Sequence, residues 1–320
     1  MAAATGTLPF KVEGKTALIT GAGSGINLSF AELLLSRGSN VVIADISLRK
    51  EAQELVDNYS SPDGPRAVFV KTDVTIWSQL ENAFDEADKQ FGSIDIVCPG
   101  AGVFEPHSSN FWNPPGSDKA KDPVHGTEKE GIGHYFTLDL NLTHPIRATQ
   151  LAISRFLNPA EKGKQASVTN PKRVVHISSI AGQTPGFATP LYQASKHAVS
   201  GFIRSLEPLD QSLGIRVNGV APGVIKTPLW TDHPEKLQML VEEQDEWVAP
   251  EEVAEAMLRC VEDDDIGGGY VMEVTKGQAR YVDWKMDPGP QGPGATASGR
   301  ATMTKEVFEW LAQPGWGSTK

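Results

Sequence analysis

Short runs of apolar, often β-branched residues alternate along this chain with longer stretches in which apolar residues recur every three or four positions. The first pattern is typical of buried strands and the second of amphipathic helices. The sequence therefore predicts seven strands: TALIT (Thr16–Thr20), NVVIAD (Asn40–Asp45), RAVFVKTDV (66–74), SIDIVC (93–98), RVVHIS (Arg173–Ser178), IRVNGVA (215–221) and GYVMEVT (269–275). A helical pattern, LSFAELLLSRG, follows the first strand, and helical stretches separate most of the others.

Apolar strands separated by helices predict a parallel sheet that is covered on both faces. We therefore expect an α/β fold: a doubly wound parallel sheet of about seven strands within a single domain over residues 1–287. Loop excursions interrupt it at 105–133, which is rich in Pro, Gly and charge, and at 229–247.

The C-terminal residues 288–320 depart from this alternation. Residues 288–298, PGPQGPGATAS, are low in complexity and predict a flexible linker. The last 17 residues have a short amphipathic pattern. It is equally consistent with a helix that docks on the body or on a partner and with a disordered tail.

Charge and composition exclude several classes of protein. The formal charge of −11 argues against nucleic acid and anionic membranes as partners. Cys98 and Cys260 are the only cysteines, which fits a reducing compartment, and the seven histidines follow no metal-ligand spacing, so no metal site is expected. The start, MAAATGTLPFKVEGK, has no signal-peptide core, and the apolar runs are too short for a membrane span. A cytoplasmic location is expected.

A glycine-rich turn, TGAGSGIN, follows the first strand and opens the helical pattern. Glycines at this place let the backbone approach a pyrophosphate, and a helix N-terminus favours its charge. Gly21 and Gly25 therefore predict a dinucleotide site. Asp45, 24 residues after Gly21, ends the second strand and is placed to accept hydrogen bonds from ribose hydroxyls, although a strand-end turn residue is the alternative. Ser24 precedes Gly25 where no basic residue stands, so NAD is favoured over NADP.

A tyrosine and a lysine, Tyr192 and Lys196, are four residues apart in a helical segment, LYQASKHAV. At this spacing, the two side chains share one helix face. A neighbouring ammonium favours the phenolate, so we expect the pKa of Tyr192 to fall and its phenol to become a proton donor or acceptor. A solvated Tyr-Lys pair without function is the alternative on this motif alone.

Together, these motifs resemble those of the short-chain dehydrogenase/reductase family over about residues 12–275. TGAGSGI matches the family's cofactor loop, including Ile26, and KTDVT, NLTHP, ISSIAG, YQASK and APGVIKT match its later motifs in order. Ser179 lies 13 residues before Tyr192, as the family requires, and is preferred to Ser178 because Gly182 follows it at the family's spacing. The stretches CPGAG and NFWNPPGS are also similar to fungal members that resemble 15-hydroxyprostaglandin dehydrogenase.

The resemblance implies a Rossmann-like fold and assigns roles to residues. Tyr192 would be the acid/base, Lys196 would lower its pKa and hold the nicotinamide ribose, Ser179 would bind the substrate oxygen, and Asn141 would hold a water that links Lys196 to solvent. The cofactor would be NAD, with NADP disfavoured. Its further contacts would be Asp73, Val74, Gly100, Ala101, Gly102, Pro222, Gly223, Ile225 and Thr227.

Two positions depart from the family pattern. Asn27 stands where the family has a third glycine, and Pro99-Gly100 stands where it usually has two asparagines. The bulk of Asn27 predicts a small local shift in the packing of helix on strand. Neither change removes a group from the implied reaction.

The implied function is the interconversion of a secondary alcohol and a ketone on a hydrophobic, lipid-like or polyketide-like substrate. Aromatic residues in the two excursions, among them Phe111 and Trp112, suggest an apolar pocket, although each ring could equally pack its own segment onto the body. A homodimer or homotetramer is expected through the helix of Tyr192 and the one near residues 135–156. Two alternatives stay open: a cofactor-binding sensor without turnover, and a protein that controls an intermediate without net redox.

Overall fold

The computed structural model describes residues 8–114, 134–232, 237, 241, 245–283 and 300–317 of the chain. Most of the excursion at 105–133, parts of the segment 229–247 and the predicted linker at 288–298 lie outside the described residues.

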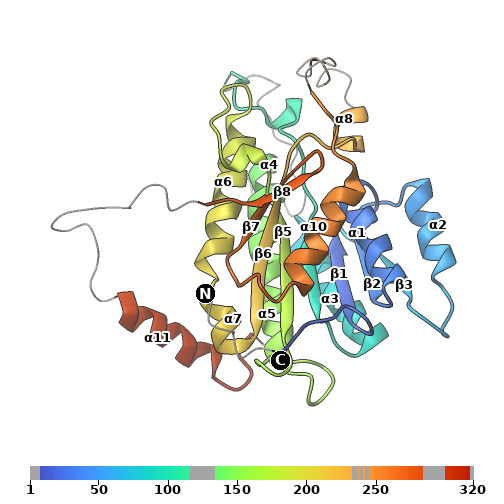
Figure 1. Cartoon of the computed structure of the whole chain (residues 1–320), viewed down its shortest axis with the longest axis vertical. Coiled ribbons are helices and arrows are strands. Elements are labelled where there is room, and N and C mark those ends of the chain that lie inside the picture. The colour runs from blue at the N-terminus through green and yellow to red at the C-terminus, as the bar shows by residue number, and fades with distance from the viewer. Residues whose placement is uncertain are drawn as a thin grey trace.

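One sheet organises the chain (Figure 1). Its strands are β1 (Thr16–Thr20), β2 (Asn40–Asp45), β3 (Ala67–Lys71), β4 (Ile96–Pro99), β5 (Lys172–Ile177), β6 (Ile215–Pro222), β7 (Val271–Thr275) and β8 (Gln278–Tyr281). They lie in the order β3-β2-β1-β4-β5-β6-β7-β8, and all neighbours pair in parallel except β7 and β8. The predicted doubly wound parallel sheet is confirmed, with each of the seven expected strands at its expected place.

The eighth strand, β8, was not predicted. It returns antiparallel to β7 through a tight turn at Lys276 and Gly277, where Gly277 has a positive φ of 66°. All four of its residues, QARY, are exposed. The strand carries no run of buried apolar residues, and sequence periodicity therefore gave no sign of it.

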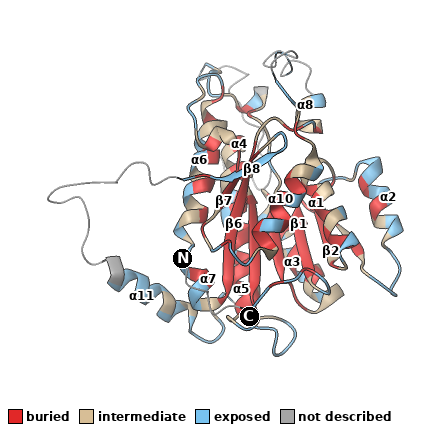
Figure 2. Ribbon diagram, in the orientation of Figure 1, coloured by how far each residue is buried: buried red, intermediate tan, exposed pale blue. Residues whose placement is uncertain are grey.

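Helices cover both faces of the sheet. One face carries α1 (Gly25–Ser36), α2 (Lys50–Asn58) and α10 (Pro250–Glu262), and the other carries α3 (Trp77–Phe91), α5 (His144–Leu157), α6 (Pro190–Ser205) and α7 (Pro208–Leu213). Successive strand residues point to opposite faces, so in β1 Ile19 joins the first layer and Leu18 the second. The strands between the two helix layers are consequently buried on both sides, whereas β8 is exposed, as Figure 2 shows.

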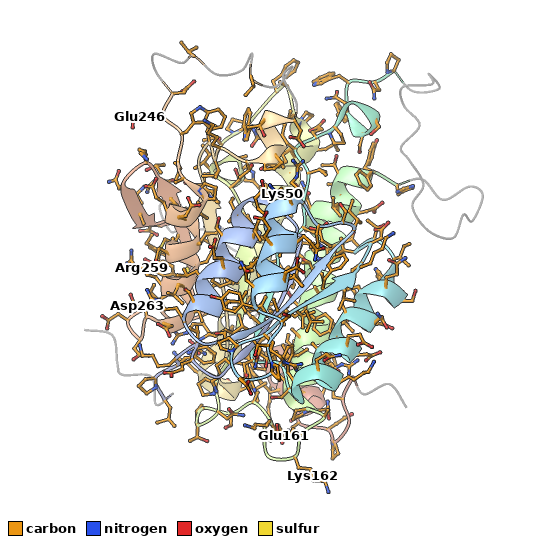
Figure 3. All side chains as sticks on the ribbon, turned by 90° about the vertical axis from the view of Figure 1, so that its right-hand side faces the viewer. Lys50, Glu161, Lys162, Glu246, Arg259 and Asp263 are labelled. Carbon is orange, nitrogen blue, oxygen red and sulfur yellow. The ribbon has the colours of Figure 1, made fainter. Side chains whose placement is uncertain are left out.

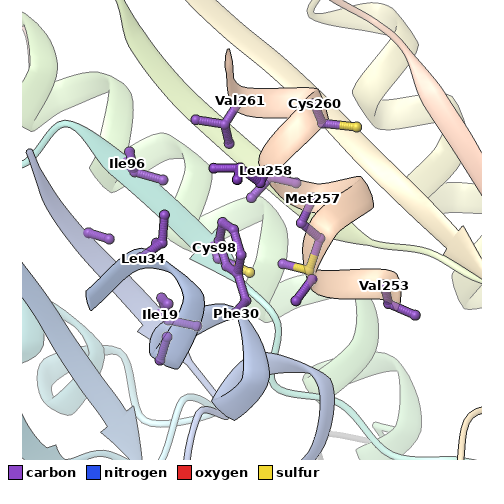
Figure 4. Packing of buried hydrophobic residues seen from close by; sticks show 14 of the residues in the cluster. Ile19, Phe30, Leu34, Ile96, Cys98, Val253, Met257, Leu258, Cys260 and Val261 are labelled. Atoms are coloured by element: carbon purple, nitrogen blue, oxygen red, sulfur yellow. The ribbon is translucent and has the colours of Figure 1, made fainter. Parts of the chain in front are cut away.

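The layer between α1 and α10 is an apolar core (Figure 4). Phe30 and Leu34 of α1 are fully buried, as is Met257 of α10. Burial of each such side chain contributes about 1.5–3 kcal/mol relative to exposure. Cys98 and Cys260 lie in this core as buried free thiols. Charged side chains such as Lys50, on the helix that faces the viewer in Figure 3, and Lys162, at the lower end of that view, are instead exposed.

The C-terminal residues return to the body of the same chain. In helix α11 (Arg300–Leu311), Phe308 and Leu311 pack against the core on the α5 side, as does Trp316 just beyond the helix. The hydroxyl of Ser154 donates to the Gly317 carbonyl at 2.7 Å, and the amide of Asn158 donates to the Trp316 carbonyl at 2.7 Å. Of the two alternatives for this segment, a docked helix and a disordered tail, the structure therefore shows the helix docked on the body. Within the described residues, none of the helices has the length and hydropathy that a bilayer crossing needs.

Two buried histidines lie between the sheet and α5. His144 Nε2 is 3.0 Å from the Thr20 hydroxyl, and its Nδ1 is 3.1 Å from the Leu140 carbonyl. His176 Nε2 is 3.1 Å from the Thr149 hydroxyl, while its Nδ1 has no partner among the described residues. Burial lowers the pKa of His144 to about 4 and that of His176 to about 3, so both rings are neutral at pH 7.

These histidines predict a loss of stability in mild acid. The unfolded chain takes up a proton at each ring below its ordinary pKa of about 6.5, whereas the folded chain does so only near pH 4 or 3. The contribution of the two neutral histidines to the free energy of unfolding is therefore complete above pH 6.5. It is lost as the pH falls toward 4, by up to about 1.4 kcal/mol per pH unit for each histidine. We expect the free energy of unfolding, measured with urea, to fall less steeply between pH 7 and pH 5 in His176→Leu than in the parent protein. An unchanged slope would contradict the assignment.

Candidate active site

A large cavity opens among the described residues where the strand order reverses between β1 and β4, which is where such sheets bind ligands. Its volume is about 790 Å³. Its wall consists largely of residues that follow the carboxyl ends of β1 to β6. All the site positions predicted from the sequence line this cavity except Asn141. The parallel sheet thus brings together residues that are up to about 200 positions apart in the chain.

The turn after β1 forms one end of the cavity. Gly21 has a positive φ of 72°, and a Cβ there would lie 2.6 Å from the Cα of Ala101, so only glycine fits. The turn leads into α1, whose N-cap residue Ser24 makes no side-chain capping bond. The first turn of α1 therefore presents backbone N–H groups to the cavity, together with its dipole. These features fit the pyrophosphate of a dinucleotide.

Asp45, at the end of β2, supports the same turn. Its carboxylate accepts the N–H of Gly23 at 2.8 Å and that of Ser47 at 3.3 Å. It lines the cavity and keeps further lone pairs for ribose hydroxyls. Arg49 lies at the same end, and its guanidinium forms an ion pair with Asp232, beyond α8 (Pro228–Thr231).

Asn27 and Gly100, the two departures from the family pattern, meet in space. A Cβ at Gly100 would lie only 2.3 Å from Oδ1 of Asn27 and 2.6 Å from its Nδ2. The Asn27 amide is almost fully buried there and donates to the Gly21 carbonyl at 3.3 Å. The expected shift to accommodate Asn27 is thus unnecessary, because the missing side chain at position 100 makes the room. The two substitutions compensate each other.

The proposed catalytic side chains come from β5 and α6. Ser179 follows β5, and its hydroxyl accepts the N–H of Ala181 at 3.1 Å and donates to the Pro222 carbonyl at 3.5 Å, while its interaction with the Tyr192 phenol lowers the pKa of that group. Ser178, the rival serine, has its hydroxyl 2.8 Å from that of Ser200 and donates to the Lys196 carbonyl at 3.2 Å. Ser178 thus anchors α6 to the sheet, whereas Ser179 is the serine that meets the tyrosine.

The expectation that Lys196 lowers the pKa of Tyr192 is wrong for this geometry. Burial raises the pKa of the phenol, and the hydrogen bond with Ser179 lowers it by less. The Lys196 ammonium donates instead to the Ile177 carbonyl at 2.9 Å and lies 5.6 Å from the centre of the Tyr192 ring. Burial also lowers the pKa of Lys196 to about 8. Desolvation thus dominates the pKa of both groups.

Asn141 lies in a π-helical turn, Asp139–Thr143, that joins α4 (Phe136–Leu138) to α5. Its amide accepts the N–H of Val103 at 2.8 Å and donates to the carbonyl of the same residue at 2.8 Å. The second amide hydrogen points to the Ser195 hydroxyl at 3.4 Å. Asn141 therefore lies behind the wall of the cavity and fixes the segment after β4 to α6. Such π-turns often occur at functional sites.

Two aromatic residues line the cavity beside Tyr192: Phe104, which the sequence did not point to, and Trp230, which belongs to the excursion at 229–247 that was expected near an apolar pocket. The Phe104 ring contacts that of Tyr192 edge to face, with centroids 4.8 Å apart, and stacks on Trp230 at 5.5 Å. Phe111 and Trp112, the rings named from the excursion, are half exposed, and Trp112 packs on Phe187 at 4.6 Å. Phe104 directly follows the stretch CPGAGV, and this position next to an expected cofactor contact is the sequence signal that could have identified it as a cavity residue.

Comparisons with known proteins agree with this geometry. A family model described as short chain dehydrogenase matches residues 15–238. The chain is 28% identical over 293 residues to 15-hydroxyprostaglandin dehydrogenase [NAD(+)] of Rattus norvegicus, covering 87% of this chain and 97% of the relative. It is 31% identical over 252 residues to cis-4-hydroxycyclohexanecarboxylate dehydrogenase of Sinomonas cyclohexanicum, covering 78% and 90% of the two chains.

The fold has a close parallel among solved structures. The crystal structure of 3-ketoacyl-(acyl-carrier-protein) reductase from Brucella melitensis, complexed with NADH, is similar with a TM-score of 0.62. The match covers 82% of this chain and 98% of that chain at 23% identity. At this identity, the likeness bears on the fold.

The contact between Asn27 and Gly100 predicts strong coupling between substitutions at the two positions. Gly100→Ala should lower the free energy of unfolding, because its Cβ meets the buried amide. Asn27→Ala should relieve that clash, so the double variant should be more stable than the sum of the single effects predicts, by about 1–3 kcal/mol. Urea unfolding of all four proteins measures the coupling. Gly267→Ala, where the added Cβ meets nothing within 4 Å, is the control, and additive effects would contradict the contact.

Proposed function

This chain belongs to the short-chain dehydrogenase/reductase family, whose members are oxidoreductases that act on alcohols and ketones, and we propose that it interconverts a secondary alcohol and a ketone on an apolar substrate with NAD(H). One observation carries the proposal. A serine and a tyrosine, Ser179 and Tyr192, line the same cavity as the glycine-rich turn at Gly21 and the carboxylate of Asp45. Proton transfer and dinucleotide binding are thereby provided within one space.

In this proposal, Tyr192 exchanges the proton at the substrate oxygen. The side chains of Tyr192 and Ser179 both line the cavity, so a single substrate oxygen placed between their hydroxyls can be bound by both. The nicotinamide cofactor, when bound, supplies or accepts the hydride. Because burial raises the pKa of Tyr192, the phenol is protonated at neutral pH and is ready to act as the acid in ketone reduction.

Lys196 and Asn141 support the tyrosine in this scheme. Lys196 lies one helical turn from Tyr192 and lines the same cavity. It would also hold the nicotinamide ribose. Asn141 would hold the water that links Lys196 to solvent, while its amide keeps the backbone of Val103 in place.

The cofactor preference is proposed from the charge at the adenosine end. A 2′-phosphate would face the Asp45 carboxylate, whereas ribose hydroxyls can donate to it. Arg49, the nearby cation, is already paired with Asp232. The similarity to an NAD-dependent 15-hydroxyprostaglandin dehydrogenase supports the same choice. The remaining dinucleotide contacts are proposed to come from the residues that follow β3, β4 and β6.

The substrate is proposed to be apolar. Phe104 and Trp230 form a stacked aromatic wall beside Tyr192, and Leu140 and Leu229 also line the cavity. Such a surface favours a hydrophobic chain or ring next to the reacting carbon. Both relatives named above act, by their names, on hydroxyl groups of largely hydrocarbon molecules. The cytoplasmic location and the homodimer or homotetramer stay predictions from the sequence.

The first test is turnover with and without the proposed acid/base. We expect absorbance at 340 nm to change when NAD or NADH is mixed with members of a panel of lipid and aromatic secondary alcohols or ketones. Tyr192→Phe should keep NADH binding but lose about a hundredfold or more of kcat, because it cannot transfer the proton. Tyr281→Phe, on the exposed strand β8, is the matched control.

The result also separates the alternatives. Substantial turnover by Tyr192→Phe would contradict the proton path. NADH binding by the parent protein without turnover on any member of the panel would favour a cofactor sensor. A rearranged product without net redox would favour intermediate control.

The second test concerns the cofactor. In a fluorescence titration, we expect NADH to bind at least about tenfold more tightly than NADPH, because a like charge next to a phosphate costs more than 1.4 kcal/mol. Asp45→Ser should narrow this difference by improving NADPH binding. Tighter binding of NADPH by the parent protein would overturn the preference.

A further inference from the structure

Helix α6, which carries Tyr192 and Lys196, has no cap of its own. Its N-cap residue, Thr189, makes no side-chain capping bond, and Pro190, the first helical residue, has no N–H. The N–H of Gln193 is satisfied by the Thr189 carbonyl at 3.1 Å. The N–H of Tyr192 has no partner within the helix, and an unsatisfied buried donor at this point would be costly.

Glu105, from the segment after β4, supplies the missing cap. Its Oε2 accepts the N–H of Tyr192 at 3.0 Å, and its Oε1 accepts the N–H of Phe111 at 3.0 Å. The residue is only 4% exposed. No cation pairs with it in the part of the chain that the structure describes. The two N–H groups and the dipole of α6 therefore hold a buried negative charge.

A buried carboxylate is an expensive way to cap a helix, because a charge loses its hydration when it is buried. A local serine or aspartate at position 189 could satisfy one N–H without this cost. Glu105 does what a local cap cannot do: it joins two segments that are far apart in the sequence. One segment contains the proposed catalytic tyrosine, and the other contains the half-exposed rings of Phe111 and Trp112.

The surrounding contacts extend this connection on both sides. Directly before Glu105, the ring of Phe104 contacts that of Tyr192. Beyond Phe111, the indole N–H of Trp112 donates to the Phe187 carbonyl at 2.8 Å, and the two rings pack at 4.6 Å. Phe187 lies just before α6 in the sequence. The segment 104–112 therefore contacts the start of α6, or the residues just before it, through Phe104 at one end and Trp112 at the other. The Glu105 carboxylate adds a third contact.

We propose that Glu105 is a positioning residue that sets the start of α6, and with it Tyr192, against the segment 104–112. Substrate that contacts the aromatic wall at Phe104 would thereby act on a tyrosine whose place is fixed by the same segment. The kinetic part of this inference rests on the proposed dehydrogenase function. The structural part, in which one carboxylate accepts two backbone N–H groups, is independent of that function.

The experiment compares two capping glutamates in the same protein. Glu105→Gln keeps the size of the side chain but replaces one accepting oxygen with an NH₂ group, which cannot accept an N–H. Glu252→Gln is the matched control. Glu252 caps α10, a helix none of whose residues lines the cavity, by accepting the N–H of Ala249 at 3.0 Å. It also accepts the N–H of Gly277 at 2.9 Å and forms an ion pair with Lys276 at 3.0 Å.

Two readouts separate a positioning role from a general loss of stability. In Glu105→Gln, we expect kcat to fall by about tenfold to a hundredfold, as a small misplacement of a reacting group does, while the Kd for NADH stays within about twofold. In Glu252→Gln, the melting temperature should fall while kcat per folded molecule stays at the parent value. Amide hydrogen exchange should accelerate at Tyr192 and Phe111 in the first variant and at neither in the second.

The proposal is overturned if Glu105→Gln keeps the parent kcat and the parent exchange rates. It is also overturned if both variants lose activity only in proportion to their unfolded fraction. If the parent protein turns over no substrate, the proposed function fails, but faster exchange at Tyr192 and Phe111 in Glu105→Gln alone would still support the connection. Unchanged exchange in that case would reject it.

Discussion

The parallel pairing of β1 with β4 is the constraint on which the rest of this structure depends. Ala17 to Thr20 pair in register with Ile96 to Pro99, so the ends of both strands meet at the same edge of the sheet. To one side of β1 lie β2 and β3, and to the other lie β4 and the later strands. The connecting helices consequently run over opposite faces, and a cavity opens between them. The cofactor turn and the proposed catalytic residues are neighbours for this reason.

At this edge, buried polar groups decide the detailed shape. The Asn27 amide occupies the space over Gly100, the Asn141 amide holds the backbone of Val103, and the Glu105 carboxylate holds the N–H of Tyr192. Each buried polar group needs a partner, so each fixes one loop to one helix. The loop after β4 takes part in all three contacts. It therefore forms the common wall between the proposed cofactor and substrate regions.

Electrostatics in the cavity are dominated by burial. Desolvation raises the pKa of Tyr192 and lowers that of Lys196 to about 8, so both groups lie in surroundings that disfavour their charged forms. These opposite shifts move the pKa values of the phenol and the amine apart, although their ordinary values are similar. Proposed proton transfer at Tyr192 then depends on hydrogen bonds, such as that with Ser179, that stabilise the phenolate at the moment it forms.

The sequence by itself determined the seven central strands, the helices between them, the cofactor turn and the Ser179, Tyr192 and Lys196 set. The strands, helices and turn are encoded locally, in apolar periodicity and in glycines at a strand end, and Tyr192 and Lys196 in a spacing of four on one helix face, whereas Ser179 was implied by the family resemblance. Only the tertiary structure decided which side chains from distant segments contact one another and what those contacts do. The pairing of Asn27 with Gly100, the cap of α6 by Glu105, the Phe104–Trp230 wall and the direction of the Tyr192 pKa shift all depend on contacts between distant segments. The exposed strand β8 belongs with these, because its pairing with β7, and no apolar pattern of its own, makes it a strand.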